Sequence, residues 1–307
     1  MKVGVISNND LCLPLLFYLI KSKAEVSLFL GKSSTIDIRK DEVPRFCSGY
    51  SVPILEESSS AETVYEWMHR INPDLIFILG HLQKIDLQKA SAGSGIFNIH
   101  FGKLPQYRGP SPLFWQLKNM EPSIGCCIHT ITEKMDAGPI YWEKEIRNED
   151  HFSHNYVQYL FSNLVVEGVN DILFNMSNKT TQAKAQDESK VRWYGRPTLS
   201  DVLIKWDTMY AAEICALVRA CNNWNNGAIT LYQGMEMKIV DASFSPSLHP
   251  GKLPGTITEV SDSIKISCLD NHELMIHYLS VNGIPFPGRQ GNKFGIMEGE
   301  KLTYPSD

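Results

Sequence analysis

The sequence has no excess of basic charge and no uninterrupted apolar run long enough to cross a bilayer. Of its 307 residues, 29 are Lys or Arg and 34 are Asp or Glu, which gives a formal net charge of −5. A protein that grips many phosphates concentrates basic residues, because neutralising phosphate charge supplies much of the affinity. The charge balance therefore argues against a nucleic-acid partner. No segment approaches the roughly 20 apolar residues of a membrane helix, so we expect no membrane association.

Paired cysteines are also missing. The seven cysteines are scattered, odd in number and without a CxxC pair. In a chain of this length, that pattern predicts reduced and mostly buried thiols rather than a disulfide framework. The adjacent Cys126 and Cys127 lie in the apolar run IGCCIHTI and are interpreted as small buried side chains of a strand. The N-terminal MKVGVISNND indicates a strand and a turn rather than a signal peptide, so we expect a cytoplasmic protein.

Apolar segments of two kinds alternate along the first half of the chain. Strands are predicted at 2–7, 24–31, 75–80, 95–100 and 123–131, and helices at 11–22, 62–71 and 155–176. Alternating strands and helices, with several strands apolar throughout, predict an α/β domain whose mostly parallel sheet is covered on both faces. Ligands of such sheets bind beyond the carboxyl ends of the strands.

The second half has a different pattern. The stretch 177–190 is polar and poor in hydrophobic residues, which makes it the best candidate for a linker. A helix is predicted at 208–222, and short strands are predicted at 227–232, 237–242, 255–260, 263–269 and 273–279. Closely spaced short strands favour a small β-barrel-like domain. We therefore predict two domains, 1–185 and 186–307, and find no internal repeat.

The chemistry is concentrated where the strand at 95–100 ends. Asn98 and His100 interrupt its apolar sequence, GIFNIH, just before the loop FGKLPQYRGPSP. Because strand side chains alternate with period two, both face the same way. A second loop carries Asp136, and Gly138–Pro139 shortly after it favours a sharp turn that projects the carboxylate. An amide, an imidazole and a carboxylate together can support acyl transfer.

Two common catalytic motifs are missing from the whole sequence. It has no GxSxG nucleophile elbow, and no Ser or Cys stands in an obvious position beside His100. The loop after the strand also lacks the GxxxxGK[ST] arrangement of a phosphate-binding loop. Direct transfer without a covalent enzyme intermediate is therefore the simpler interpretation.

These motifs resemble the folate-dependent formyltransferase family, which includes methionyl-tRNA formyltransferase, glycinamide ribonucleotide formyltransferase and sugar-nucleotide N-formyltransferases. The resemblance rests on Asn98-x-His100, the following LPQYRGPSP and Asp136. It continues through RPTLSDVLIKWD, LVRACNNWNNGAIT and KLPGTI, which are similar to the C-terminal OB-like domain of the tRNA enzyme and of some sugar enzymes. It implies a Rossmann-like catalytic domain followed by an OB-like β-barrel domain.

The resemblance also implies a mechanism and a co-substrate. A substrate amine would attack the formyl carbon of N10-formyltetrahydrofolate, with no metal. Asn98 and protonated His100 would stabilise the oxyanion, while Asp136 would tune His100 and help to remove the amine proton. The implied folate-binding residues are Gly80, His81, Leu82, Gln83, Ile85, Asp136 and Gly138. The candidate residues for binding the acceptor are Phe101, Lys103, Gln106, Tyr107 and Arg108.

The choice of acceptor rests on a departure from the family pattern. The tRNA enzyme carries a long basic loop after its second strand, whereas GKSSTIDIRKDEVPRF (31–46) is short and nearly charge-balanced here. We therefore expect a small-molecule amine, a nucleotide-linked amino sugar first, with methionyl-tRNA as the alternative. Hydrolysis of the formyl-folate, transfer to a peptide-bound amine and a catalytically silent folate- or nucleotide-binding module are further alternatives. A homodimer is left open.

Three other residues receive structural interpretations. His129 lies in the strand before Asp136 and is interpreted as structural. Trp206 and Trp224 are expected to fill the core of the second domain.

Overall fold

The computed structural model describes residues 1–32, 41–57, 63–81, 83–91, 95–180, 182–221, 225–246 and 251–305. The chain forms two compact units. One contains Met1–Pro112, Gly125–Ile146 and Gln158–Tyr194, and the other contains Leu113–Ile124, Arg147–Val157 and Gly195–Asp307. The predicted domain boundary between 185 and 186 stays a prediction.

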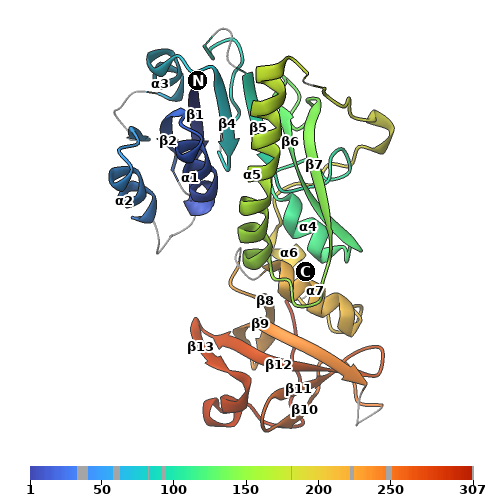
Figure 1. Ribbon diagram of the computed structural model, residues 1–307. Coiled ribbons are helices and arrows are strands. Elements are labelled where there is room, and N and C mark those ends of the chain that lie inside the picture. Colours follow the sequence, from blue (N-terminus) through green and yellow to red (C-terminus); the bar gives the residue numbers. More distant parts are fainter. Residues whose placement is uncertain are drawn as a thin grey trace. The chain divides into compact units, whose positions relative to one another are not determined.

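A seven-stranded sheet forms the centre of the first unit, in the order β3-β2-β1-β4-β5-β6-β7 (Figure 1). Its strands are β1 (Lys2–Ser7), β2 (Glu25–Leu30), β3 (Ile54–Glu56), β4 (Leu75–Leu79), β5 (Gly95–His100), β6 (Ser123–Thr130) and β7 (Ile140–Arg147). The pairs from β3 to β5 are parallel, and β6 runs antiparallel to β5. This confirms the predicted mostly parallel sheet. The chain leaves β1 on one side through β2 and returns on the other at β4, which creates the switch point where ligands of such sheets bind.

Helices cover the sheet because its strands are apolar on both faces. The helices of the first unit are α1 (Leu13–Lys21), α2 (Glu42–Gly49), α3 (Val64–Ile71) and most of α5 (His154–Asn178), whereas nearly all of α4 (Pro112–Lys118) belongs to the second unit. On one face Trp67 of α3 packs against Phe29, with ring centroids 5.7 Å apart. It shares a core cluster with Ile6 and Ile76. α1 and α5 lie side by side in front of the sheet, joined by a hydrogen bond from the Tyr18 hydroxyl to Asn170 Oδ1 (Figure 1).

The second unit contains an antiparallel sheet in the order β10-β11-β12-β9-β8, with β13 paired to β12. Its elements are α6 (Leu199–Val202), α7 (Ala211–Cys221), β8 (Ala228–Tyr232), β9 (Met235–Pro246), β10 (Ile257–Val260), β11 (Ile264–Ser267), β12 (His272–Val281) and β13 (Ile284–Pro287). Residues 301–303 bridge Thr256 beside β10 and Leu231 in β8, so they join the two edges of the sheet. The predicted fold class is confirmed.

The core of the second unit holds one of the two tryptophans expected there. Trp206 is buried, and its indole N–H donates to Thr230 Oγ1 at 2.9 Å, which satisfies the polar atom of a large buried ring. Trp224 lies outside the described residues.

Candidate active site

The pairing of β5 with β6 sets which polar side chains meet. In the antiparallel register Asn98 stands opposite His129, and His100 stands opposite Cys127. Residues directly opposite in such a pair share one face of the sheet. The Asn98 amide Nδ2 lies 3.2 Å from His129 Nε2. His129 therefore lies on the same face of the sheet as Asn98 and His100. It adds a second imidazole to the predicted group.

His100 is buried, and one of its ring nitrogens already forms a hydrogen bond within the protein. Nε2 lies 2.7 Å from the carbonyl oxygen of Tyr107. A carbonyl can only accept, so Nε2 carries the hydrogen and donates. The other nitrogen, Nδ1, faces Asp136 Oδ1 at 3.8 Å. Nδ1 is therefore the atom of His100 that can exchange a proton in this site.

Asp136 arrives on the turn after β6 with the left-handed backbone conformation φ +53°. This region is uncommon for residues other than glycine, although aspartate tolerates it better than most. Its Oδ2 accepts the backbone N–H of Gly109 at 2.9 Å. That bond leaves Oδ1 directed at both histidines, 3.8 Å from His100 Nδ1 and 3.7 Å from His129 Nε2. Both distances exceed a hydrogen bond.

His129 is held neutral in this cluster. Burial is the main reason that its pKa is lowered to about 4, and the neighbouring His100 contributes in the same direction. Its Nδ1 lies 2.9 Å from the carbonyl oxygen of Thr130, so Nδ1 carries the hydrogen and donates. Nε2 then carries a lone pair and accepts one of the two N–H bonds of the Asn98 amide. The interaction fixes which end of that amide is nitrogen, and the amide nitrogen carries a second N–H.

The structure thus brings together the three predicted catalytic residues. Asn98 and His100 come from β5, and Asp136 approaches His100 from the turn after β6. His100, His129 and Asp136 also place their potential ligand atoms within 4.8 Å of one another, as a metal site would. Proton transfer and oxyanion stabilisation can proceed without a metal. That the enzyme uses no metal stays a prediction.

The residues expected to bind the acceptor have different surroundings. Tyr107 is buried and stacks on Tyr194, with ring centroids 5.0 Å apart. Arg108 is also buried, and it donates to Gln186 Oε1 and to Glu188. Phe101 packs edge-on against Phe161 of α5. These three side chains are therefore built into the interior of the first unit.

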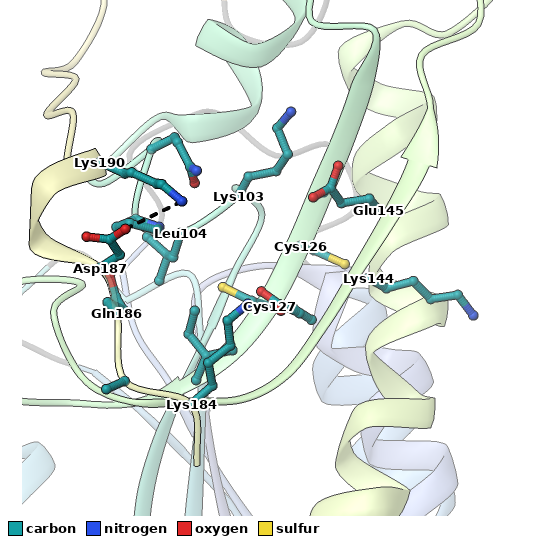
Figure 2. A pocket seen from close by; sticks show the side chains of 16 residues that line it. Lys103, Leu104, Cys126, Cys127, Lys144, Glu145, Lys184, Gln186, Asp187 and Lys190 are labelled. Atoms are coloured by element: carbon teal, nitrogen blue, oxygen red, sulfur yellow. Dashed lines mark hydrogen bonds and ion pairs between the residues drawn. The ribbon is translucent and has the colours of Figure 1, made fainter.

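Lys103 and Gln106 instead line a cavity of about 200 Å³ beside β6 and β7. Figure 2 shows Lys103, Cys126, Cys127 and Gln186 around it, with Asp187 and Lys190 joined as an ion pair. Burial raises the pKa of both cysteine thiols, so neither is a reactive thiolate. Among the expected acceptor residues, Lys103 and Gln106 are the two that reach this cavity.

The expected folate-binding residues follow β4 and β6. Gly80 has φ +78°, and a Cβ at this position would lie 2.7 Å from Asn8 Oδ1. His81 Nε2 and Asn8 Oδ1 are buried and have no hydrogen-bond partner among the described residues. Burial lowers the pKa of His81. Two unsatisfied polar atoms at the carboxyl ends of β1 and β4 suit a polar ligand at the switch point.

The other residues expected to bind folate differ in burial and surroundings. Ile85 is buried in the core cluster that contains Trp67, and Gln83 is exposed. A Cβ on Gly138 would overlap the carbonyl oxygen of Thr130, so the turn after Asp136 requires glycine there. Leu82 lies outside the described residues.

Sequence reasoning missed part of this site. Gln186 lies in the polar stretch predicted as a linker, yet its Nε2 donates to the carbonyl oxygens of Asp136 and Gly138 at 2.8 and 2.7 Å. Polar residues are ordinary in a linker, so the stretch carried no signal. His129 was recognised but interpreted as structural, and its position opposite Asn98 was visible only after β6 was paired with β5.

Comparison with known proteins agrees with this fold. The family model described as Formyl transferase matches residues 36–158, which include Asn98, His100 and Asp136. The model described as Formyl transferase, C-terminal domain, matches residues 198–285. The protein belongs to the formyl transferase family.

Solved structures share the fold at low sequence identity. An N-formyltransferase from Helicobacter canadensis, in complex with folinic acid and dTDP-3-aminofucose, is 16% identical with a TM-score of 0.72; 90% of this chain and 98% of that one are covered. WlaRD, a sugar 3N-formyltransferase in the presence of dTDP and 5-N-formyl-THF, is 17% identical with a TM-score of 0.71; 92% and 98% are covered.

HypX from Aquifex aeolicus, in complex with tetrahydrofolic acid, is 19% identical with a TM-score of 0.69. The match covers 99% of this chain but 51% of HypX, so the chain spans about half the length of that protein.

In the part of the chain that the structure describes, no helix is both long and apolar enough to cross a membrane.

Proposed function

We propose that the protein is an N-formyltransferase that moves the formyl group of N10-formyltetrahydrofolate to the primary amine of a small molecule, a nucleotide-linked amino sugar. The observation that carries the proposal is the convergence of Asn98, His100 and Asp136 at the end of β5, inside the region that matches the formyl transferase family. The expectation of a cytoplasmic enzyme stays part of this proposal.

The transfer requires one bond to form and one to break at the formyl carbon. The lone pair of the acceptor amine forms the new C–N bond, and the carbonyl electrons move to oxygen. When the tetrahedral intermediate collapses, the bond from carbon to N10 of the folate breaks and N10 gains a proton. The attacking nitrogen loses a proton. A site for this reaction therefore needs an oxyanion stabiliser and a proton acceptor.

The arrangement of Asn98, His100 and Asp136 supports the proposal for both groups. The Asn98 amide has one N–H fixed on His129 and a second that can donate to the oxyanion. His100, when protonated, carries a hydrogen on Nδ1, because Nε2 already donates to Tyr107. That hydrogen is available to the same oxyanion. Asp136 Oδ1 lies beside His100 Nδ1 and can accept the proton that leaves the amine, directly or through His100.

The donor is proposed to lie at the carboxyl ends of β1 and β4. Here the unsatisfied polar atoms of Asn8 and His81 offer hydrogen-bonding capacity. The backbone of Asp136 to Gly138 would form the other side. The support is the position of these groups at the switch point, together with the folate compounds named in the neighbouring structures.

The acceptor class rests on two observations. WlaRD and the N-formyltransferase from Helicobacter canadensis are each matched over 98% of their own length and are described with dTDP and with dTDP-3-aminofucose, respectively. The stretch 31–46 is also short and nearly charge-balanced, whereas a strongly basic segment would suit a tRNA partner.

A direct assay tests the proposal. The protein is incubated with N10-formyltetrahydrofolate and, separately, with nucleotide-linked 3-amino sugars, 4-amino sugars and initiator methionyl-tRNA. Formylated products are detected by mass spectrometry. Formylation of an amino sugar is the expected result. Formylation of methionyl-tRNA alone would overturn the acceptor, and formate release that is independent of every amine would show a hydrolase.

A further inference from the structure

The segment that follows α5 contacts the catalytic loops instead of connecting two domains freely. Lys184 forms an antiparallel bridge with Ile140 at the start of β7, with backbone hydrogen bonds of 2.8 Å in both directions. Trp193 forms a parallel bridge with Arg108. Residues 184–193 are therefore fixed at both ends to the unit that contains His100 and Asp136.

Gln186 stands between these two anchors and holds the backbone of the Asp136 turn. Its Nε2 donates to the carbonyl oxygens of Asp136 and Gly138, at 2.8 and 2.7 Å. An amide nitrogen has two N–H bonds, so both are used by this turn. Asp136 has the uncommon φ of +53°, and such a conformation persists only when its surroundings enforce it.

The orientation of the Gln186 amide is fixed by Arg108. Nε and Nη2 of Arg108 both donate to Gln186 Oε1, at 3.1 and 2.8 Å. A guanidinium has no acceptor, so the oxygen of Gln186 must face Arg108 and the nitrogen must face the turn. Arg108 is buried, and Nη2 also donates to Glu188 Oε1 at 2.6 Å, which compensates part of its charge.

We propose that Gln186 is a positioning residue that, oriented by Arg108, holds the Asp136 turn so that the Asp136 carboxylate faces His100. The proposal rests on the proposed function for its kinetic consequence, but its structural consequence is independent of it. It also gives Arg108 a role: the guanidinium orients the amide that holds the acid, rather than contacting the acceptor.

The variant Gln186→Glu tests the amide nitrogen at constant shape. A carboxylate oxygen would then face the two carbonyl oxygens, and all three are acceptors, so the turn loses both hydrogen bonds. A displacement of about 1 Å in a catalytic group can lower a rate by roughly 10²-fold. We expect kcat to fall by roughly 10- to 100-fold, while KM for the acceptor stays within about twofold. Gln182→Ala, an exposed change on the same segment, is the matched control and should leave both constants unchanged.

Combination with Asp136→Ala separates positioning from a general structural effect. If Gln186 acts through the Asp136 carboxylate, Gln186→Glu should lower kcat little further once that carboxylate is absent. An equal fall in kcat in both backgrounds would overturn the proposal.

A crystal structure of Gln186→Ala provides the readout that does not depend on activity. Asp136 should leave its left-handed conformation, and the 2.9 Å contact between its Oδ2 and the Gly109 nitrogen should be lost. An unchanged turn would overturn the positioning role even if the enzyme is an active formyltransferase. A displaced turn in a protein that formylates no amine would overturn the proposed function alone.

Discussion

Two regions supply the candidate site, and they differ in how plainly the sequence shows them. β5 brings Asn98 and His100 on an apolar strand, where each polar side chain is conspicuous. The segment 184–193 brings Gln186, which sits among residues that are nearly all polar. The strand end places the reacting groups, whereas the polar segment fixes the loop that carries Asp136. A polar residue is thus easily noticed where it interrupts an apolar pattern, but it gives no signal in a segment that is polar throughout.

Removing the imidazole at the strand end should have the largest effect. His100→Ala deletes both the proton-carrying Nδ1 and the donor to the Tyr107 carbonyl. We expect kcat/KM for formyl transfer to fall roughly 10³-fold or more. His69→Ala, a change at an exposed histidine of α3, is the control and should retain activity. Turnover within about tenfold of the unaltered enzyme would contradict the assigned role of His100.

Removing the amide at the same strand end should have the next largest effect. Asn98→Ala deletes the N–H assigned to the oxyanion, and loss of one such donor lowers kcat by roughly 10²- to 10³-fold. The measurement is steady-state kinetics with saturating donor. A rise in KM at unchanged kcat would instead show that Asn98 binds the ground state.

Breaking the polar network should affect stability more modestly. Arg108→Met leaves Gln186 Oε1 without its two guanidinium donors, although the Glu188 carboxylate remains largely exposed to water. We expect the free energy of unfolding to fall by about 2 kcal/mol in urea denaturation, below the range for a fully buried pair. Arg192→Met changes an exposed side chain nearby and should change it by less than about 0.5 kcal/mol. Equal effects of the two variants would show that the hydrogen bonds of Arg108 make no specific contribution to the free energy of unfolding.

The neutral state of His129 predicts a pH dependence of stability. Burial lowers the pKa of His129 from 6.5 to about 4 in the folded protein. Between these pH values the unfolded chain binds the extra proton, so stability is complete above pH 6.5 and falls as the pH decreases towards 4. One such group contributes a slope of at most about 1.4 kcal/mol per pH unit.

His154, whose pKa burial also lowers to about 4, acts in the same direction. His129→Asn should therefore reduce the slope of unfolding free energy against pH over this range without abolishing it. An unchanged slope would show that His129 is protonated in the folded protein.

The smallest effect is expected from metal removal. His100, His129 and Asp136 could ligate a metal ion geometrically, but the proposed chemistry uses only their protons and hydrogen bonds. Dialysis against a chelator should leave kcat unchanged. Loss of activity that added Zn²⁺ restores would contradict the assignment of these residues.

Much of the fold follows from local patterns, and the exceptions have physical reasons. β1, β2, β4, β5 and β6 are largely apolar runs, so their positions along the chain could be predicted. β3 has only three residues, too few for a periodic signal. β7 begins with three apolar residues, IYW, directly after the Gly138–Pro139 turn, and most of its remaining residues are charged. This pattern gives no clear period-two signal, so the start of β7 is not separable from the predicted loop 132–142.

The residues of the site likewise differ in whether local sequence patterns reveal them. Asn98, His100 and Asp136 could be found because the strand pattern and the turn after the acid point to them. His129 required the antiparallel register of β5 and β6, and Gln186 required a contact across 50 residues of sequence. Such non-local pairings are set by packing, which a reading of local patterns cannot supply.

The most direct test of the central claim is a single-turnover experiment with radiolabelled N10-formyltetrahydrofolate, a nucleotide-linked amino sugar and either the unaltered protein or Asp136→Asn. The change keeps the size of the side chain and its acceptor for the Gly109 N–H but removes the charge beside His100. The account predicts that label moves to the sugar amine with the unaltered protein and that the rate falls roughly 10²-fold or more with the variant. Equal rates would contradict it, as would label that appears only as formate.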